Sequence, residues 1–257
     1  MSTPWILEAR NLTKRFGGLT AVKALTINVA RGALYGLIGP NGAGKTTVFN
    51  LLTGQSDPSE GEIVFDGTRI DGKKPHQTAQ LGMARTFQNI RLFADMTVLE
   101  NVLAAHHLRS RQVLADAVLG TSRHHVEERE MQDRAVKLLK IFDLDRLANE
   151  PATSLPYGSQ RRLEIARALA TEPKLLLLDE PAAGMNPQEK VELMNLIRFI
   201  RDRFGVGILL IEHDMNLVMN VCERITVLDH GETIAVGTPA EIQQNPDVIE
   251  AYLGEPG

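Results

Sequence analysis

The segment Gly39–Thr47, with the sequence Gly-Pro-Asn-Gly-Ala-Gly-Lys-Thr-Thr, constrains the fold of this chain more than any other part. It fits a pattern of glycine, four residues and Gly-Lys-Thr, and it follows the apolar run Leu34–Ile38. A buried strand would here deliver the chain to a turn whose glycines can adopt positive φ and leave no Cβ in the way. Successive backbone N–H groups can then surround an anion at the positive end of the following helix. The segment therefore predicts a phosphate-binding loop, with a nucleoside triphosphate as its ligand.

Two side chains of this loop have predicted roles beyond those of the backbone. Lys45 can reach the terminal phosphates, and the hydroxyl of Thr46 is suited to a phosphate-bound Mg²⁺. The alternative, a glycine-rich turn that only joins a strand to a helix, does not explain why strand, spacer, lysine and threonine occur in register. We expect nucleotide contacts from Asn41, Gly42, Ala43, Gly44, Lys45, Thr46 and Thr47.

A second strong signal is the segment Lys174–Pro181, with the sequence Lys-Leu-Leu-Leu-Leu-Asp-Glu-Pro. A continuous apolar run indicates a strand that is buried on both faces of a largely parallel sheet. The carboxylates of Asp179 and Glu180 then lie at its carboxyl end, where α/β sheets place their ligands. We expect Asp179 to hold Mg²⁺ through water and Glu180 to act as the general base. A surface turn is the weaker alternative, because two acids that end a buried strand are costly without a cation or partner.

Three further residues are candidates for the same site. The apolar run Val206–Ile211 predicts another buried strand, and His213 follows it closely, where it could contact a phosphate or fix a water molecule. Gln88 could ligate Mg²⁺ or orient water, although glutamines of this kind more often lie in solvated loops. Phe16 could stack on a nucleobase. For His213 and Phe16, a purely structural role is equally compatible with the local pattern.

The remaining patterns predict an α/β protein with an inserted helical part. Short apolar runs such as Ile6–Leu12 and Leu25–Val29 predict strands, some of them antiparallel, before the phosphate loop. From Met96 to about Leu147 the apolar spacing is helical. Residues 155–160 predict a turn, and residues 161–169 an amphipathic helix. Two closing strands around residues 224–237 and a helical tail with a break at Pro246 complete the chain.

Composition narrows the class of protein. Of 257 residues, 43% are hydrophobic and 23% charged, as in an ordinary soluble globular protein. A net charge of −4 gives no reason to expect nucleic acid or an anionic membrane as a partner. The single cysteine, Cys222, excludes an intrachain disulfide and is expected to be a small buried residue. Since no apolar run approaches the roughly 20 residues that span a bilayer, a membrane role would depend on a partner.

The order of these motifs resembles the ATP-binding subunits of ABC transporters, over residues 5 to about 254. Leu-Pro-Tyr-Gly-Ser at 155–159 aligns with the family signature Leu-Ser-Gly-Gly-Gln, and Ile165–Leu169 fixes the alignment. The resemblance implies a P-loop NTPase core at 5–95 and 165–240, with a mostly parallel sheet and an antiparallel β subdomain. It also implies an α-helical subdomain at about 96–164 and a C-terminal tail at 239–257.

The resemblance also assigns ligands and roles. It implies that ATP and Mg²⁺ bind and that ATP is hydrolysed. The implied catalytic residues are Lys45, Gln88, Glu180 and His213, the implied metal ligands are Thr46, Gln88 and Asp179, and the implied nucleotide contacts beyond the phosphate loop are Phe16, Val22, Gly158 and Ser159. In this family the signature loop closes over ATP bound to the opposite subunit.

Two departures from the family pattern matter, one in the signature and one in the D-loop. The signature serine is Pro156 here and the signature glutamine is Ser159. Pro156 offers neither a hydroxyl nor an N–H to a phosphate, so the contact to the opposite γ-phosphate is expected to depend on Gly158 and Ser159. The aspartate of the D-loop is Asn186, which can still hydrogen-bond but carries no charge.

Further segments resemble the subunits of branched-chain amino acid importers: residues 180–187, 210–215 and 245–254. The lipopolysaccharide-exporter ATPases share much of this pattern. Importer membership implies membrane-embedded permease subunits, a second ATP-binding subunit (a copy or a paralogue) and, indirectly, a periplasmic binding protein. It implies a peripheral location on the cytoplasmic face of the inner membrane, and no nucleic-acid partner.

Other classes of function fit the chain less well. Soluble ABC-type ATPases of translation or DNA repair usually carry two nucleotide domains or long coiled-coil insertions, and this chain has neither. A P-loop kinase would leave the signature helix unexplained. A nucleotide-dependent switch without hydrolysis is disfavoured by Glu180, which is placed as a general base.

Overall fold

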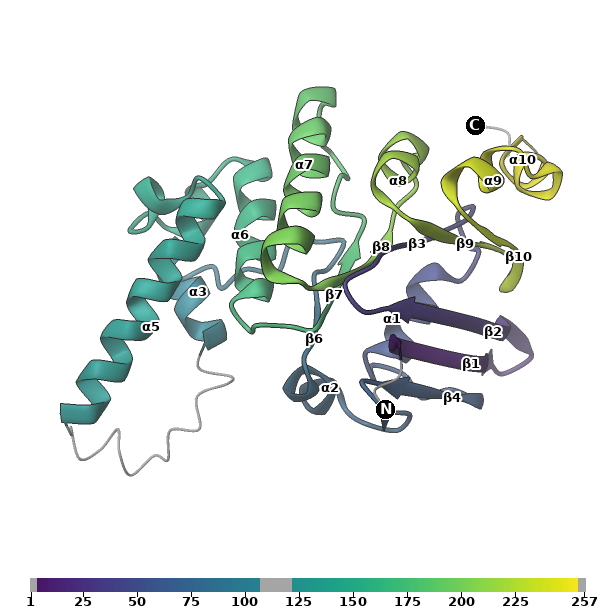
Figure 1. Cartoon of the computed structure of the whole chain (residues 1–257), viewed down its shortest axis with the longest axis horizontal. Helices are drawn as coiled ribbons and strands as arrows, with labels where there is room; N and C mark the ends of the chain where they lie inside the picture. The colour runs from purple at the N-terminus through teal and green to yellow at the C-terminus, as the bar shows by residue number, and fades with distance from the viewer. Residues whose placement is uncertain (1–3, 107–121, 254–257) are drawn as a thin grey trace. The chain divides into compact units, whose positions relative to one another are not determined.

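The computed structural model describes residues 4–106 and 122–253 (Figure 1). At residues 122–127 and 253 it describes the backbone but not the side chains. Contacts divide the chain into two compact units, Met1–Gln88 with Lys174–Gly257, and Asn89–Pro173. We call them the core unit and the helical unit. The predicted helical segment 96–164 falls inside the helical unit. The last four residues of the predicted tail lie outside the described residues.

The core unit contains a six-stranded sheet in the order β10-β9-β3-β8-β7-β6. All neighbours are parallel except β10 and β9. Every residue of β3, β7 and β8 is buried, so the continuous apolar runs form strands covered on both faces, as predicted. The strands are β3 (Leu34–Ile38), β6 (Met83–Arg85), β7 (Leu175–Asp179), β8 (Gly207–Ile211), β9 (Arg224–Asp229) and β10 (Glu232–Gly237).

The register of this sheet brings three loops to one edge. Leu37 on β3 and Asp179 on β7 both lie opposite Ile211 on β8. The segments that follow these three strands therefore leave the sheet side by side. They are the phosphate loop, the segment that begins with Glu180, and the segment that begins with Glu212.

A second, antiparallel sheet has the order β2-β1-β4-β5. Its strands are β1 (Trp5–Phe16), β2 (Leu19–Ala30), β4 (Glu60–Phe65) and β5 (Thr68–Arg69). Strands β1 and β2 are longer than the predicted apolar runs, because bulges let each strand continue past the polar residues that interrupt the run. The pairing shifts between Ala9 and Leu12, where Asn11 has a φ of 51°, and Ala24 on β2 has a φ of 49°.

Helix α1 packs between the two sheets, and α7 and α8 cover the opposite face of the six-stranded sheet (Figure 1). One apolar cluster joins Phe49 and Leu52 of α1 to side chains of β1, β3, β7 and β8. On the other face, a Cβ at Gly36 would stand 3.0 Å from the Sγ atom of Cys222. Cys222 is buried as expected, and burial raises its pKa to about 12. The helices of the core unit are α1 (Lys45–Leu52), α2 (Pro75–Leu81), α7 (Pro187–Phe204), α8 (Met215–Val221), α9 (Pro239–Gln243) and α10 (Pro246–Leu253).

The described part of the helical unit consists of α3 (Val98–His106), α5 (Ser122–Ile141) and α6 (Tyr157–Leu169), which pack on one another. Two short 3₁₀ turns, Asp145–Leu147 and Ala152–Ser154, connect α5 to α6. The helical spacing predicted the buried side in part: Val98, Val102, Leu139 and Leu144 are fully buried. Four other residues assigned to the same faces are half-buried: Leu103, His106, Val136 and Ile141. The structure thus confirms the α/β class, with a mainly parallel sheet, an antiparallel β part and an inserted helical part.

Candidate nucleotide site

The phosphate loop has the backbone that its glycines predict. Gly39, Gly42 and Gly44 have φ values of 151°, 78° and 99°. A Cβ at Gly39 would lie 2.0 Å from the carbonyl oxygen of Leu228, and one at Gly44 would lie 2.5 Å from that of Ala21. Both positions therefore require glycine for conformation and for space. Helix α1 begins within this segment, at Lys45, and no side chain caps its N-terminus. Its first N–H groups are thus suited to an external anion.

The side chain of Lys45 lies along the inside of this loop. Its Nζ atom donates to the carbonyl oxygens of Gly39 and Pro40, at 2.6 and 2.8 Å, and the residue is only 7% exposed. A hydrogen bond from the turn between β9 and β10 also fixes the loop, since the N–H of Gly231 donates to the carbonyl oxygen of Ala43 at 3.1 Å. Asn41, Gly42 and Thr46 are exposed, Gly44 and Thr47 are half-buried, and Ala43 is buried.

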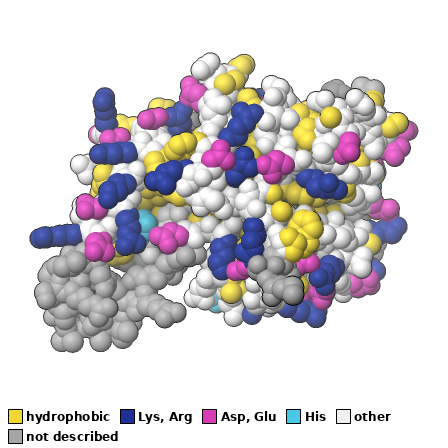
Figure 2. All heavy atoms as spheres, in the orientation of Figure 1, with side chains coloured by type: hydrophobic (Ala, Val, Ile, Leu, Met, Phe, Trp, Pro, Cys, Tyr) yellow, Lys and Arg dark blue, Asp and Glu magenta, His cyan; other side chains and the backbone are white. Residues whose placement is uncertain are grey.

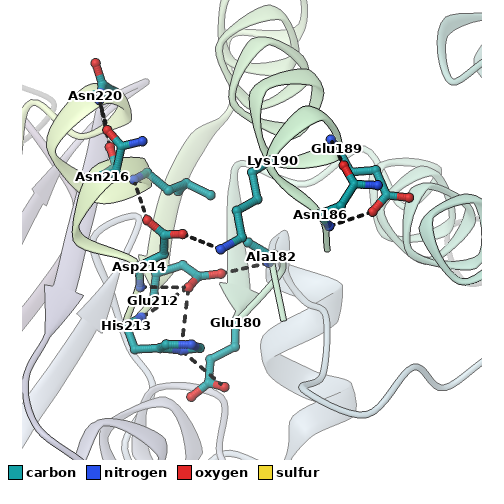
Figure 3. A network of polar contacts seen from close by, with 11 residues as sticks. Glu180, Ala182, Asn186, Glu189, Lys190, Glu212, His213, Asp214, Asn216 and Asn220 are labelled. Atoms are coloured by element: carbon teal, nitrogen blue, oxygen red, sulfur yellow. Dashed lines mark hydrogen bonds and ion pairs between the residues drawn. The ribbon is translucent and has the colours of Figure 1, made fainter. Parts of the chain in front are cut away.

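Three predicted catalytic residues meet at the carboxyl ends of β7 and β8. The Nε2 atom of Gln88 donates to Oε2 of Glu180 at 2.9 Å, although 92 positions separate the two in sequence. The Nδ1 atom of His213 lies 3.8 Å from the same oxygen (Figure 3). The N–H of Glu180 donates to the carbonyl oxygen of Ile211 at 2.9 Å, which explains why the two strand ends present their side chains together.

The conformation of Glu180 is unusual for its residue type. Its φ is 46°, a region that residues with a Cβ seldom adopt, and that clusters at functional sites. The carboxylate is mostly buried, whereas the imidazole of His213 is 59% exposed. A half-enclosed carboxylate beside an accessible imidazole is an arrangement that can accept a proton from a water molecule.

Asp179 has a different environment from its neighbour. Its buried Oδ2 atom accepts from Nη2 of Arg85 at 2.7 Å, and both side chains are almost fully enclosed. The guanidinium also donates to Oδ1 of Asn50 at 2.8 Å, and it lies 5.4 and 5.2 Å from the ring centres of Phe49 and Phe87. Arg85 thus joins β6, β7 and α1. Sequence analysis did not identify this residue. The signal was a basic side chain in a short strand-forming segment just before Gln88.

The two residues expected near the base differ from each other. Phe16 is 53% exposed, with the Nζ atom of Lys14 lying 5.0 Å from the ring centre, so its ring can be stacked upon. Val22 is completely buried. Its Cγ2 atom lies 3.5 Å from the position that a Cβ on Gly44 would take. Val22 therefore packs against the phosphate loop at Gly44 and does not present its side chain at the surface.

In the helical unit, the signature segment is more helical than predicted. Helix α6 begins at Tyr157, whereas the sequence analysis placed a turn over 155–160. Pro156 has a φ of −55° at the N-cap, and the N–H of Gln160 donates to its carbonyl oxygen at 2.9 Å. A proline fits there because its fixed φ suits a helix start and no N–H is required of it. Gly158 and Ser159 therefore lie in the first helical turn, which no side chain caps.

A buried ion pair holds this helix in its unit. The Nη1 atom of Arg161 donates to Oε2 of Glu164 at 2.7 Å, and both side chains are at most 1% exposed. Oε1 of Glu164 accepts from the backbone N–H of Arg91 at 3.3 Å. Sequence analysis predicted only an amphipathic helix here, because local spacing does not show that two charged residues are buried against each other.

A family model described as ABC transporter matches residues 22–183, which include the phosphate loop, Gln88, the signature segment and Glu180. The chain belongs to the ABC transporter family. A second model, described as Branched-chain amino acid ATP-binding cassette transporter, matches residues 232–257 of this cassette.

Named relatives of the cassette match almost their whole length. It is 49% identical over 255 residues to the high-affinity branched-chain amino acid transport ATP-binding protein BraF of Pseudomonas aeruginosa, covering 99% of this chain and 100% of that one. It is 48% identical to LivG of Escherichia coli K12, a protein of the same description, with the same coverage. Identity to the lipopolysaccharide export system ATP-binding protein LptB of E. coli K12 is 35%, over 97% of both chains.

Solved structures agree with this assignment. The ADP conformation of MJ1267, an ATP-binding cassette of an ABC transporter, superimposes with a TM-score of 0.84 at 32% identity, covering 98% of this chain and 100% of that one. The dimeric post-hydrolysis state of the cassette MJ0796 bound to ADP and Pi has a TM-score of 0.76 at 27% identity, covering 91% and 98%. These matches confirm the P-loop NTPase fold. Within the described ranges 4–106 and 122–253, no helix is long and apolar enough to cross a bilayer.

Proposed function

We propose that this cassette binds ATP with Mg²⁺ and hydrolyses it to power the import of branched-chain amino acids through membrane-embedded permease subunits. The observation that carries the catalytic part is the meeting of Gln88, Glu180 and His213 beside the phosphate loop. The identities of 48–49% to branched-chain amino acid proteins, and the match over 232–257, support this cargo above lipopolysaccharide, for which identity is 35%.

Each group of the site has a distinct task in this proposal. The backbone N–H groups of the phosphate loop and Nζ of Lys45 hold the β- and γ-phosphates. Water attacks the γ-phosphorus, its proton passes to Oε2 of Glu180, and the bond to the β–γ bridging oxygen breaks. Gln88 holds that carboxylate by its hydrogen bond. His213 lies where it can contact the γ-phosphate or the attacking water. Phe16 stacks on the adenine.

The Mg²⁺ ion would be held by Thr46, Gln88 and Asp179. These residues supply a hydroxyl, an amide and a carboxylate oxygen, the donor types that Mg²⁺ prefers, and Thr46 is exposed on the first turn of α1. When bound, the ion neutralises charge on the phosphate oxygens. Because Asp179 is paired with Arg85, its contact to the ion would run through water.

The other half of each pocket would come from a second ATP-binding subunit, either a copy or a paralogue. The N–H groups of Gly158 and Ser159, in the uncapped first turn of α6, are suited to the γ-phosphate held by that partner. A periplasmic binding protein would act indirectly, and the cassette would lie on the cytoplasmic face of the inner membrane. On the face drawn in Figure 2, described basic and acidic side chains are interspersed, which disfavours a nucleic-acid surface there.

Glu180→Gln tests the catalytic part. Without a base, turnover should fall at least about 100-fold. ATP should still bind, and a dimer should accumulate with ATP and Mg²⁺, as measured by phosphate release, nucleotide titration and light scattering. Glu232→Gln, which alters an exposed carboxylate on β10, is the matched control and should behave as the native chain. Native turnover in Glu180→Gln would exclude Glu180 as the base.

The cargo requires a separate experiment. The cassette, purified with its co-expressed membrane partners, should show ATPase activity that leucine and a matching binding protein stimulate. Stimulation by lipopolysaccharide instead would favour the exporter function and leave the ATPase proposal intact.

A further inference from the structure

A completely buried carboxylate, Glu212, lies between two loops of the site without belonging to the set of residues described above. Its Oε1 atom accepts from the N–H of Ala182 at 2.7 Å. Its Oε2 atom accepts from the N–H groups of His213 and Asp214, at 3.1 and 3.3 Å. One side chain thus binds the backbone just after Glu180 and the backbone of His213 and Asp214 (Figure 3).

The hydrogen bonds of Glu212 only partly offset the cost of its burial. Burial raises the pKa of Glu212 above its usual value, and the three backbone N–H groups and the nearby His213 lower it by less than burial raises it. A carboxylate has acceptor sites on both oxygens, so it can serve N–H groups that arrive from opposite sides. Neutral side chains of similar size cannot, because an amide presents one oxygen and one N–H₂ group.

A second link joins the same two segments. Lys190, in the first turns of α7, donates from Nζ to Oδ2 of Asp214 at 2.6 Å. Asp214 also caps α8, since its Oδ1 atom accepts from the N–H of Leu217 at 3.1 Å. The segment after β7 and the segment after β8 are therefore fastened at the buried Glu212 and again nearer the surface.

These contacts have a geometric consequence for Glu180 and His213. Oε2 of Glu212 lies 3.7 Å from Nδ1 of His213, and that same nitrogen lies 3.8 Å from Oε2 of Glu180. Ala182 is two residues after Glu180, and the N–H of Ala183 donates to the carbonyl oxygen of Glu180 at 3.2 Å. Fixing Ala182 therefore fixes the turn that carries the base, while the contact to the N–H of His213 fixes the backbone that carries the imidazole.

We propose that Glu212 is a positioning residue for ATP hydrolysis, which clamps the segment after β7 to the segment after β8 so that Glu180 and His213 keep a set separation. The proposal rests on the proposed ATPase function. The hydrogen bonds of Glu212 go to the segments after β7 and β8, so its loss should affect the chemical step more than nucleotide binding.

Glu212→Gln is the main test, because it preserves shape and replaces one acceptor oxygen by a donor that must face a backbone N–H. We expect kcat for ATP hydrolysis to fall about 10-fold or more, while KM changes less than about threefold. Thr226→Val is the matched control. It removes another buried hydrogen bond of the core unit, between the hydroxyls of Thr226 and Tyr35 at 2.8 Å, and should keep the native kcat.

The double variant with Glu180→Gln separates positioning from general damage. If Glu212 acts through Glu180, adding Glu212→Gln should not lower the residual turnover further, whereas structural damage would multiply the two losses. Multiplied losses, or equal losses of kcat in Glu212→Gln and Thr226→Val, would overturn the proposal. If Glu212→Gln does not fold, Lys190→Met tests the outer link, with kcat expected to fall two- to fivefold and an unchanged kcat contradicting the clamp. Native turnover in Glu180→Gln alone would overturn the catalytic proposal itself.

Discussion

The phosphate loop and the signature segment both present the start of a helix that no side chain caps, yet the two are built differently. In the loop, glycines with positive φ curve the backbone, and Lys45 brings a cation to the carbonyl oxygens of the turn. In the signature, a proline begins an ordinary helical turn, and the nearby basic residue Arg161 is directed into the unit, onto Glu164. We therefore expect the loop to bind an anion alone, and the signature to offer its N–H groups to an anion that another subunit already holds.

The anchoring of the two helices differs in the same way. Behind the loop, Arg85 joins Asn50 of α1 to Asp179, and 94 positions of sequence separate Arg85 from Asp179. Behind the signature, Arg161 and Glu164 are three positions apart on one helix. The first pair fixes the relation between the loop helix and the catalytic strand. The second pair, through the bond from the N–H of Arg91 to Glu164, fixes the signature helix within the helical unit. We infer that the core unit sets the relative positions of the groups that act in ATP hydrolysis.

Among the variants that test this comparison, Arg85→Met should have the largest effect, a loss of folding stability. Removing one partner of a buried ion pair leaves the other charge uncompensated, which costs about 3–5 kcal/mol of folding free energy. Denaturant unfolding of the purified chain measures that cost. Adding Asp179→Asn removes the stranded charge, so the double variant should recover part of the lost stability. A loss below about 1 kcal/mol in Arg85→Met would show that the pair is not an anchor.

How far the sequence predicts this molecule depends on the range of the interaction. Continuous apolar runs predicted β3, β7 and β8, because a strand that is buried on both faces has apolar residues at consecutive positions. The glycine positions predicted the loop, because positive φ is a local demand. Arg85 and Glu212 could not be found in this way. A buried charge is stable only through partners from distant segments. A basic residue in a short strand-forming segment, or an acid after a buried strand, does not show which partners it will meet.

The start of α6 illustrates a different limit. Pro156, Gly158 and Ser159 are turn formers, so local propensity predicts a turn through them. In the structure the proline is the N-cap and the others lie in the first turn, where weak helix formers are tolerated because packing of α6 on α3 and α5 determines the outcome.

Lys45→Ala should have the next largest effect, on binding and not on folding. Charge-assisted hydrogen bonds to phosphate contribute about 1.5–3 kcal/mol, so ATP affinity should fall about 100-fold, or about 2.8 kcal/mol. Titration with a fluorescent ATP analogue gives the affinity. Lys23→Ala, which removes an exposed lysine of β2 paired with Glu232, is the control and should bind normally. Unchanged affinity in Lys45→Ala would contradict the claim that the loop binds an anion alone.

Pro156→Ser should have the smallest effect, and it tests whether the signature acts through backbone or side chain. If the N–H groups of Gly158 and Ser159 make the contact, the residue at the N-cap is not needed for it. ATPase activity of the dimer should then stay the same or rise about twofold, since a serine cap stabilises a helix by about 0.5–2 kcal/mol relative to alanine. Pro156→Ala, which removes the ring without adding a hydroxyl, separates capping from backbone stiffness. A rise in ATPase activity of tenfold or more that is confined to the serine variant would mean that the hydroxyl itself reaches the phosphate. The loop and the signature would then differ only in that the loop also has Lys45. A large loss in both variants would instead assign the rigid ring of Pro156 a role in presenting the first turn of α6.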